Sequence, residues 1–146
     1  MFALTMTVGI ALTVLLLELT GLVAGGIIVP AYVSTILDSP ASLAMLFGMA
    51  LCVQGAIRLL AHAMPLYGTR LYGITVLVGG VLNAGAQHLL APLMQHQAVS
   101  IEWSAFGYLV PGLVAYHFHR QGILRTVLMI AIAAPLVRAI VVLLRP

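Results

Sequence analysis

The side chains of this 146-residue chain that could do acid–base or metal chemistry are three acids, six basic residues and five histidines. All six basic residues are arginines, and the chain has no lysine. A guanidinium keeps its charge and binds carboxylates through two parallel hydrogen bonds, so this set suits a carboxylate-bearing ligand. Arginines are equally expected as plain markers of the cytoplasmic side of a membrane protein. The six are Arg58, Arg70, Arg120, Arg125, Arg138 and Arg145.

Two charged residues lie close to long apolar runs. Glu18 ends the first run and is followed by Thr20 and Gly21. An acid near the membrane interior is a candidate functional group, and the alternative is a carboxylate that only marks the end of the span. Arg138 lies about 9 Å from the end of its helix, at 1.5 Å per residue. We expect it either to snorkel to the interface or to face a cavity, where it would pair with Glu18 or guide an anion.

The histidines do not predict a metal site. His117 and His119 are two residues apart, so on a helix they point away from one another and cannot share an ion. His62, His88 and His96 have no acid or thiol at ligand spacing. The chain also has no G-x-x-x-x-G-K-[ST] phosphate loop, no G-x-S-x-G motif and no carboxylate pair typical of hydrolases. We therefore expect no metal, no cofactor and no catalytic residue on this chain.

The composition is that of an integral membrane protein. Hydrophobic residues make up 63% of the chain and charged residues 6%, whereas a soluble domain is about 25% charged. The polar stretches between apolar runs are too short for a soluble domain, so residues 1–146 form a single multi-pass membrane domain. The arginines are spread along the chain, which excludes the clustered basic face that nucleic-acid binding needs.

A short motif occurs twice and predicts two related halves. Residues 25–33 (GGIIVPAYV) recur as residues 106–114 (FGYLVPGLV), with the two prolines 81 residues apart (111 − 30 = 81). Each copy places a proline and a glycine within an apolar run, and both residue types favour a bend or break in a helix. Broken helices at corresponding positions of two halves indicate the working site of a membrane protein.

The predicted fold is an all-α membrane bundle with an internal repeat over residues 1–64 and 66–146. Each half has two long transmembrane helices and one helix broken by proline and glycine, which gives about six membrane segments. The long spans are predicted over residues 2–17, 41–57, 71–90 and 122–144, the last interrupted at Pro135. The broken segments are predicted over residues 21–37 and 103–119. We also expect Asp38 to cap the following helix, Gly48 and Gly55 to permit close helix contact, and Asn83 to be buried.

The sequence leaves the number of crossings open. If the broken segments cross, there are six crossings in two inverted triplets, and Arg58, Arg70, Arg120 and Arg125 fall on one side. The positive-inside rule would make that side cytoplasmic, although Arg145 opposes it and Arg138 is a second candidate to do so. If the broken segments are re-entrant, there are four crossings, and Arg120 and Arg125 lie opposite the other two.

Four motifs, in the same order and at compatible spacing, resemble those of the PgsC/CapC membrane subunit of bacterial poly-gamma-glutamate synthase. Residues 18–21 (ELTG) and 26–32 (GIIVPAY) look like its E-x-T-G…G-x-x-V-P-G-Y signature, and residues 66–70 (LYGTR) look like its L-Y-G-[basic] loop. Residues 107–115 (GYLVPGLVA) with 121–122 (QG) resemble its second signature, G-x-x-V-P-G-L-x-A…Q-G. Ala31 and Thr69 depart from the pattern. The resemblance covers essentially the whole chain.

This resemblance implies a non-catalytic subunit in the bacterial cytoplasmic membrane, with PgsB/CapB-type and PgsA/CapA-type partners. The first partner is a cytoplasmic amide ligase, which would bind the ATP and Mg²⁺. The membrane subunit would anchor that ligase and pass the polyanionic polymer across the bilayer, and enclosing a pore would need several copies or subunits. The alternatives are a pure scaffold, through which nothing passes, and a stand-alone small transporter or channel built on an inverted repeat.

The candidate site residues form two sets. The expected contacts to the polymer or a partner are Glu18, Thr20, Arg58, Tyr67, Arg70, Arg120 and Arg138. The expected broken-helix motif consists of Gly21, Gly26, Pro30, Tyr32, Gly107, Pro111, Gly112, Gln121 and Gly122.

Overall fold

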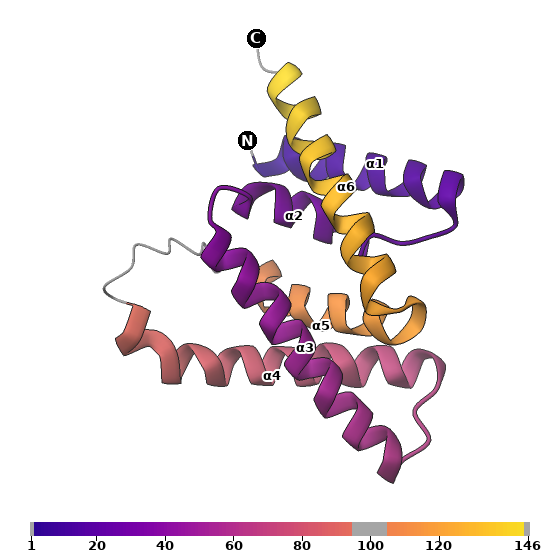
Figure 1. Cartoon of the computed structure of the whole chain (residues 1–146), viewed down its shortest axis with the longest axis vertical. Helices are drawn as coiled ribbons and strands as arrows, with labels where there is room; N and C mark the ends of the chain where they lie inside the picture. The colour runs from indigo at the N-terminus through magenta and orange to yellow at the C-terminus, as the bar shows by residue number, and fades with distance from the viewer. Residues whose placement is uncertain (1, 95–104, 145–146) are drawn as a thin grey trace. The chain divides into compact units, whose positions relative to one another are not determined.

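The computed structural model describes residues 2–94 and 105–144, and all regular structure in these ranges is helical (Figure 1). The six helices are α1 (Phe2–Thr20), α2 (Val29–Ile36), α3 (Pro40–Ala63), α4 (Gly68–Met94), α5 (Ala105–Gln121) and α6 (Ile123–Leu143). The prediction of an all-α protein is confirmed. Within the described residues, α1, α3 and α6 are long and apolar enough to cross a membrane. Six crossings in two related halves stay a prediction.

The helix ends follow local sequence signals. α1 ends where Gly21 adopts a positive φ of 68°, a conformation that glycine reaches without a side-chain clash. α3 begins after Ser39, whose hydroxyl accepts a hydrogen bond from the Ser42 backbone N–H at 3.4 Å, and Pro40 occupies the first turn. The prediction that Asp38 caps this helix is therefore wrong. The shorter serine side chain, one residue later, holds the cap position.

The prolines do not break helices where the sequence suggested. In the first half, residues 21–28 are non-helical, and Pro30 lies in the first turn of α2, where its missing N–H costs nothing. Pro111 lies inside α5 and Pro135 inside α6, and both helices are continuous. The expected breaks at these two residues are wrong. A proline inside a helix loses one hydrogen bond, a loss that a packed membrane helix tolerates because its neighbours support the chain.

The chain divides into two compact units, of which one combines both ends of the chain and the other contains the middle. Unit 1 comprises residues 1–38 and 117–146, so it contains α1, α2 and α6. Unit 2 comprises residues 39–116, with α3, α4 and most of α5. In unit 1, α6 packs on both α1 and α2, and α1 packs on α2, while in unit 2 α3 packs on α4. Unit 1 therefore joins the first two helices of the chain to the last one.

Each unit contains one close helix crossing built on glycine. In unit 1, a Cβ on Gly9 would lie 3.0 Å from the Ala31 Cα, and in unit 2 a Cβ on Gly79 would lie 2.7 Å from the Gly112 Cα. Ala31 and Gly112 directly follow Pro30 and Pro111, so the crossing recurs at the motif that is repeated in the sequence. The internal repeat itself stays a prediction.

Gly48 and Gly55 do not make the close contacts expected of them. A Cβ on either residue would meet nothing within 4 Å, and both residues lie on an exposed face of α3. Small residues permit close approach only on the face that meets another helix. In these two units that role falls to Gly9, Gly79 and Gly112.

We expect Gly79→Val to destabilise the protein by about 1–3 kcal/mol or more, because the new side chain would press on the backbone of α5, which cannot move aside as a flexible side chain can. The measurement is the midpoint of thermal unfolding in detergent. Gly85→Val is the matched control, since it makes the same change in α4 where a Cβ meets nothing within 4 Å. Equal melting temperatures for the two variants would contradict the tight crossing.

Candidate functional site

The non-helical segment between α1 and α2 is the centre of the candidate site. Residues 21–28 leave α1 at Gly21 and pass through Gly25 and Gly26, whose φ values are 73° and 130°. These conformations are strained for any residue with a side chain, which explains two consecutive glycines here. Backbone groups in a non-helical segment need partners at membrane depth, because lipid offers none.

Thr20 supplies the first of these partners. Its hydroxyl donates to the Leu16 carbonyl at 2.6 Å and accepts from the Leu22 backbone N–H at 3.2 Å. One side chain therefore serves both the last turn of α1 and the first residues of the segment. We expected Thr20 to contact the polymer or a partner, and that role stays a prediction.

Gln121, at the end of α5, supplies the second partner from the other end of the chain. Its Oε1 accepts from the Val23 backbone N–H at 3.3 Å, and its Nε2 donates to the Val23 carbonyl. One amide thus satisfies both backbone groups of a residue 98 positions away. The same Nε2 also reaches the Thr126 hydroxyl at 3.2 Å. We call this set of contacts, made by Gln121 to Val23 and Thr126, the amide clamp.

The corner between α5 and α6 orients the clamp. Gly122, with a φ of 93°, is the only residue between the two helices, so the chain turns sharply there. The Thr126 hydroxyl, which meets Gln121, donates to the Gly122 carbonyl at 2.9 Å and closes the corner. Four motif residues named from the sequence, Thr20, Gly21, Gln121 and Gly122, therefore lie in unit 1 around one segment. Thr126 and Val23 were not anticipated, because neither belongs to a recognisable motif.

α2 leaves the clamped segment as a short helix that is buried almost all round. Val29, Ala31 and Val33 are at most 2% exposed, and Pro30 and Tyr32 are also buried. α1 and α6 provide this cover. An eight-residue helix is too short to be stable alone, so its position depends on that packing and on the segment before it.

The ion pair of Arg138 corrects one prediction. Arg138 Nη1 lies 2.7 Å from Asp38 Oδ1, and Nη2 donates to Oδ2 at 2.9 Å, which is a two-point contact between α6 and the end of α2. Arg138 therefore does not pair with Glu18, which is exposed on α1. Its charge is already matched by a carboxylate, and guidance of an anion by Arg138 stays a prediction.

The Asp38 pair should make the stability of the protein weakly pH-dependent. The hydrogen bond and the positive charge of Arg138 hold the pKa of Asp38 below its ordinary value. A depressed folded-state pKa means that the stabilisation is present above the unfolded pKa and is lost as the pH falls through the lower, folded value. We expect a small fall in melting temperature on acidification, since the Asp38 side chain is 76% exposed.

Asp38→Asn should remove that part of the pH dependence, while Glu18→Gln, a matched neutralisation of an unpaired acid, should leave it in place. The measurement is the melting temperature in detergent between neutral and acid pH. The same acid slope in wild type and in Asp38→Asn would contradict a stabilising pair.

Unit 2 holds buried polar groups near its own crossing helices. Asn83 in α4 is 3% exposed, as predicted. One turn later, Gln87 Oε1 accepts from the Tyr108 hydroxyl at 2.7 Å. Gln54 in α3 is 4% exposed, and neither of its amide atoms has a hydrogen-bond partner among the described residues. The sequence gave no signal for Gln54 or Gln87, because an isolated glutamine in an apolar run fits a core and a surface equally well.

The remaining contact candidates are exposed residues of both units. Arg58, Tyr67 and Arg70 lie on the α3–α4 hairpin of unit 2 and are exposed. Arg120 is exposed at the end of α5, and Glu18 is exposed near the end of α1. The seven proposed contact residues are therefore divided between the two units, and their joint role stays a prediction. Among the described residues, no three histidine, cysteine or acidic side chains lie together in a metal-binding arrangement.

The amide clamp has the chemistry of a structural joint. Its members are an amide, a hydroxyl and backbone groups, which donate and accept hydrogen bonds but do not gain or lose a proton near neutral pH. Such a joint can hold the non-helical segment in one conformation and tie it to the end of α5.

Comparison with known proteins gives a consistent result. A family model described as capsule biosynthesis CapC matches residues 8–127. The chain is 28% identical over 116 residues to the PGA biosynthesis protein CapC of Bacillus subtilis (strain 168), covering 79% of this chain and 76% of that protein. It is 25% identical over 123 residues to the capsule biosynthesis protein CapC of Bacillus anthracis, covering 84% and 80%. No solved structure matches the chain.

Proposed function

Because this chain belongs to the CapC family of capsule biosynthesis proteins, we propose that it is the membrane subunit of a poly-gamma-glutamate synthase. The resemblance indicated by the sequence motifs is confirmed at the level of the family. One relative is named for PGA biosynthesis, and the proposal transfers that role to this chain. In this role the subunit anchors a cytoplasmic ligase, which binds the ATP and Mg²⁺ and forms the amide bonds.

The observation that carries the proposal is the extent of the family match. It runs from α1 into α6 and includes both sides of the amide clamp, Val23 and Gln121. The match therefore includes most of α1, all of α2 and the corner between α5 and α6. A clamped non-helical segment supported by α2 and α6 offers the ligase a rigid surface, and rigid surfaces lose little entropy on binding.

The anchoring role predicts a physical complex. When the full chain and its ligase subunit are produced together, we expect the ligase to co-purify with the membrane subunit in mild detergent. In the absence of the membrane subunit we expect the ligase in the soluble fraction and no polymer from the cells. The control is an unrelated membrane protein of similar size with the same tag. Polymer formed at the normal rate by ligase alone would contradict the proposal.

Passage of the polymer is the second part of the proposed role, and the same cells test it. If the subunit is a conduit, some variants should still bind the ligase and yet accumulate polymer inside the cell. If it is a scaffold, polymer output should follow ligase binding in every variant. A stand-alone transporter, the alternative, would move its solute in vesicles that contain this chain alone, and would not retain the ligase.

A further inference from the structure

The described residues of unit 2 contain two full charges, and both are arginines. Arg58 lies in α3 and Arg70 in α4, and neither guanidinium makes an ion pair or hydrogen bond with a described residue. The two described carboxylates, Glu18 and Asp38, belong to unit 1, where Asp38 already pairs with Arg138. Within the described part of unit 2, no carboxylate is present to balance the two arginines.

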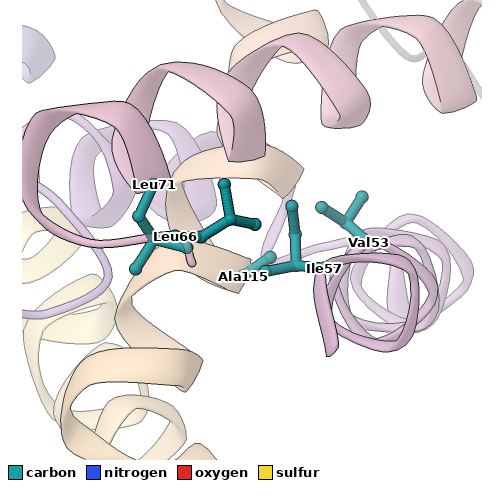
Figure 2. Packing of buried hydrophobic residues seen from close by; sticks show 5 residues of the cluster. All are labelled: Val53, Ile57, Leu66, Leu71 and Ala115. Atoms are coloured by element: carbon teal, nitrogen blue, oxygen red, sulfur yellow. The ribbon is translucent and has the colours of Figure 1, made fainter. Parts of the chain in front are cut away.

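The two arginines lie at the same end of the α3–α4 pair. Their immediate neighbours, Ile57 and Leu71, pack into one buried cluster with Leu66 (Figure 2). Arg58 directly follows Ile57 and Arg70 directly precedes Leu71, so both arginines are attached to the backbone beside this cluster, and both are exposed. We call this end of unit 2, made of Arg58, Arg70 and residues 62–67, the arginine hairpin.

The length of α3 places the arginine hairpin at the edge of a bilayer. Its 24 residues extend about 36 Å, whereas the hydrocarbon core is about 30 Å thick, so the last turns reach the headgroup level. Only four residues separate α3 from α4, and α4 therefore starts at a similar depth. Tyr67 is 81% exposed, and tyrosines prefer this interface. Tyr72 is held by an edge-on contact with Tyr116, whose ring centroid lies 5.2 Å away.

Exposed apolar side chains beside the arginines favour a lipid over a soluble protein as the ligand of the arginine hairpin. Leu59, next to Arg58, is 76% exposed, and Met64 is 60% exposed. Side chains of this kind are stable where acyl chains meet headgroups, while an arginine extends its charged end outward from the same level. An acidic soluble partner would satisfy the arginines but would leave these apolar neighbours at the margin of the contact.

We propose that the arginine hairpin binds the phosphate of an anionic phospholipid headgroup, with Arg58 and Arg70 as the two cationic ligands. Guanidinium groups donate two parallel hydrogen bonds to a phosphate, and neither arginine needs to leave a competing partner to do so. The lipid fixes the depth of unit 2 in the membrane. The inference stands apart from the identity of the ligase that the chain serves.

The test uses the full chain in detergent, with phosphatidylglycerol or phosphatidylcholine added and bound lipid counted by native mass spectrometry. We expect wild type to retain phosphatidylglycerol in preference to phosphatidylcholine. In the double variant R58Q/R70Q, the affinity for phosphatidylglycerol should fall by about tenfold or more, since each basic residue near an anionic surface contributes separately. R58K/R70K should keep most of the binding, because the charge remains. Arg125→Gln, at an exposed arginine of unit 1, is the matched control.

Two results would overturn the proposal. One is phosphatidylglycerol binding that is as strong in R58Q/R70Q as in wild type, or that is lost to the same extent in Arg125→Gln. The latter loss would mean that only the net charge of the protein matters. The other is lipid binding that is unchanged while the ligase no longer co-purifies, which would assign the hairpin to a protein partner. Both arginines are exposed, so the melting temperature without added lipid should match wild type. The single variants R58Q and R70Q provide the test if the double variant does not purify.

Discussion

Replacing Gln121 with alanine should lower the stability of the protein by about 1–3 kcal/mol and reduce capsular polymer in cells to a small fraction of the wild-type level. The change removes the partner of both backbone groups of Val23, and an unsatisfied buried backbone group costs about 1–3 kcal/mol. For the N–H and the carbonyl of Val23 together we expect about 1–3 kcal/mol, the lower end of the summed cost, because Val23 is only half-buried. The stability is read from thermal unfolding in detergent.

Gln121→Glu should lower the stability less than Gln121→Ala does. The difference separates the hydrogen bond that Gln121 accepts from the two that it donates. A carboxylate can still accept from the Val23 N–H, but it cannot donate to the Val23 carbonyl or to Thr126. Arg125→Gln, four residues further along the chain at an exposed position of α6, should behave as wild type. If Gln121→Ala melts and produces polymer as Arg125→Gln does, the clamp does not hold the segment.

Polymer output distinguishes the clamp from general stability. Gly79→Val should lower the melting temperature through unit 2 without touching the clamp. If the surface around residues 21–28 binds the ligase, Gln121→Ala should lose more co-purified ligase than Gly79→Val at equal amounts of folded protein. Equal losses would mean that the clamp acts only through stability.

The sequence singled out the glycines and the proline around the clamp because their types are tied to backbone demands. Gly21, Gly26 and Gly122 all take positive φ values in the structure, which is why glycine is needed there. Pro30 belongs to the first turn of a helix for the same kind of reason. The sequence could not predict that Gln121 would reach Val23, because no periodic pattern relates two residues 98 positions apart.

Other features could not be predicted because the sequence of an apolar helix says little about which of its faces packs on protein. When nearly every side chain of a helix is apolar, the face that packs on protein cannot be told from the face that meets lipid. Gly48 and Gly79 looked alike in the sequence, but only Gly79 lies at a crossing. For the same reason Asp38 was not foreseen as the partner of Arg138, and neither was the packing of α6 on α1 and α2.

That pairing has a testable consequence for the chain as a whole. The halves 1–64 and 66–146 expressed separately should each fail to accumulate in the membrane, and produced together they should recover a substantial part of the folded protein. Alone, the first half lacks the α6 that covers α1 and α2, and its α3 lacks α4. The cut at residue 65 lies in the short α3–α4 connection and interrupts no helix. The measurements are the amount of each fragment in membranes and their co-purification through a tag on one of them.

A different cut is the matched control. Separating residues 1–38 from 39–146 also interrupts no helix, but it leaves α3, α4 and α5 on one piece and so keeps unit 2 intact. We expect the 39–146 piece to accumulate better alone than 66–146 does, because only α6 lacks its partners there, whereas in 66–146 α4 lacks α3 as well. Stable accumulation of residues 1–64 alone, with a cooperative melt, would contradict the interleaved units. It would mean that α1, α2 and α3 pack on one another instead of exchanging partners with the second half.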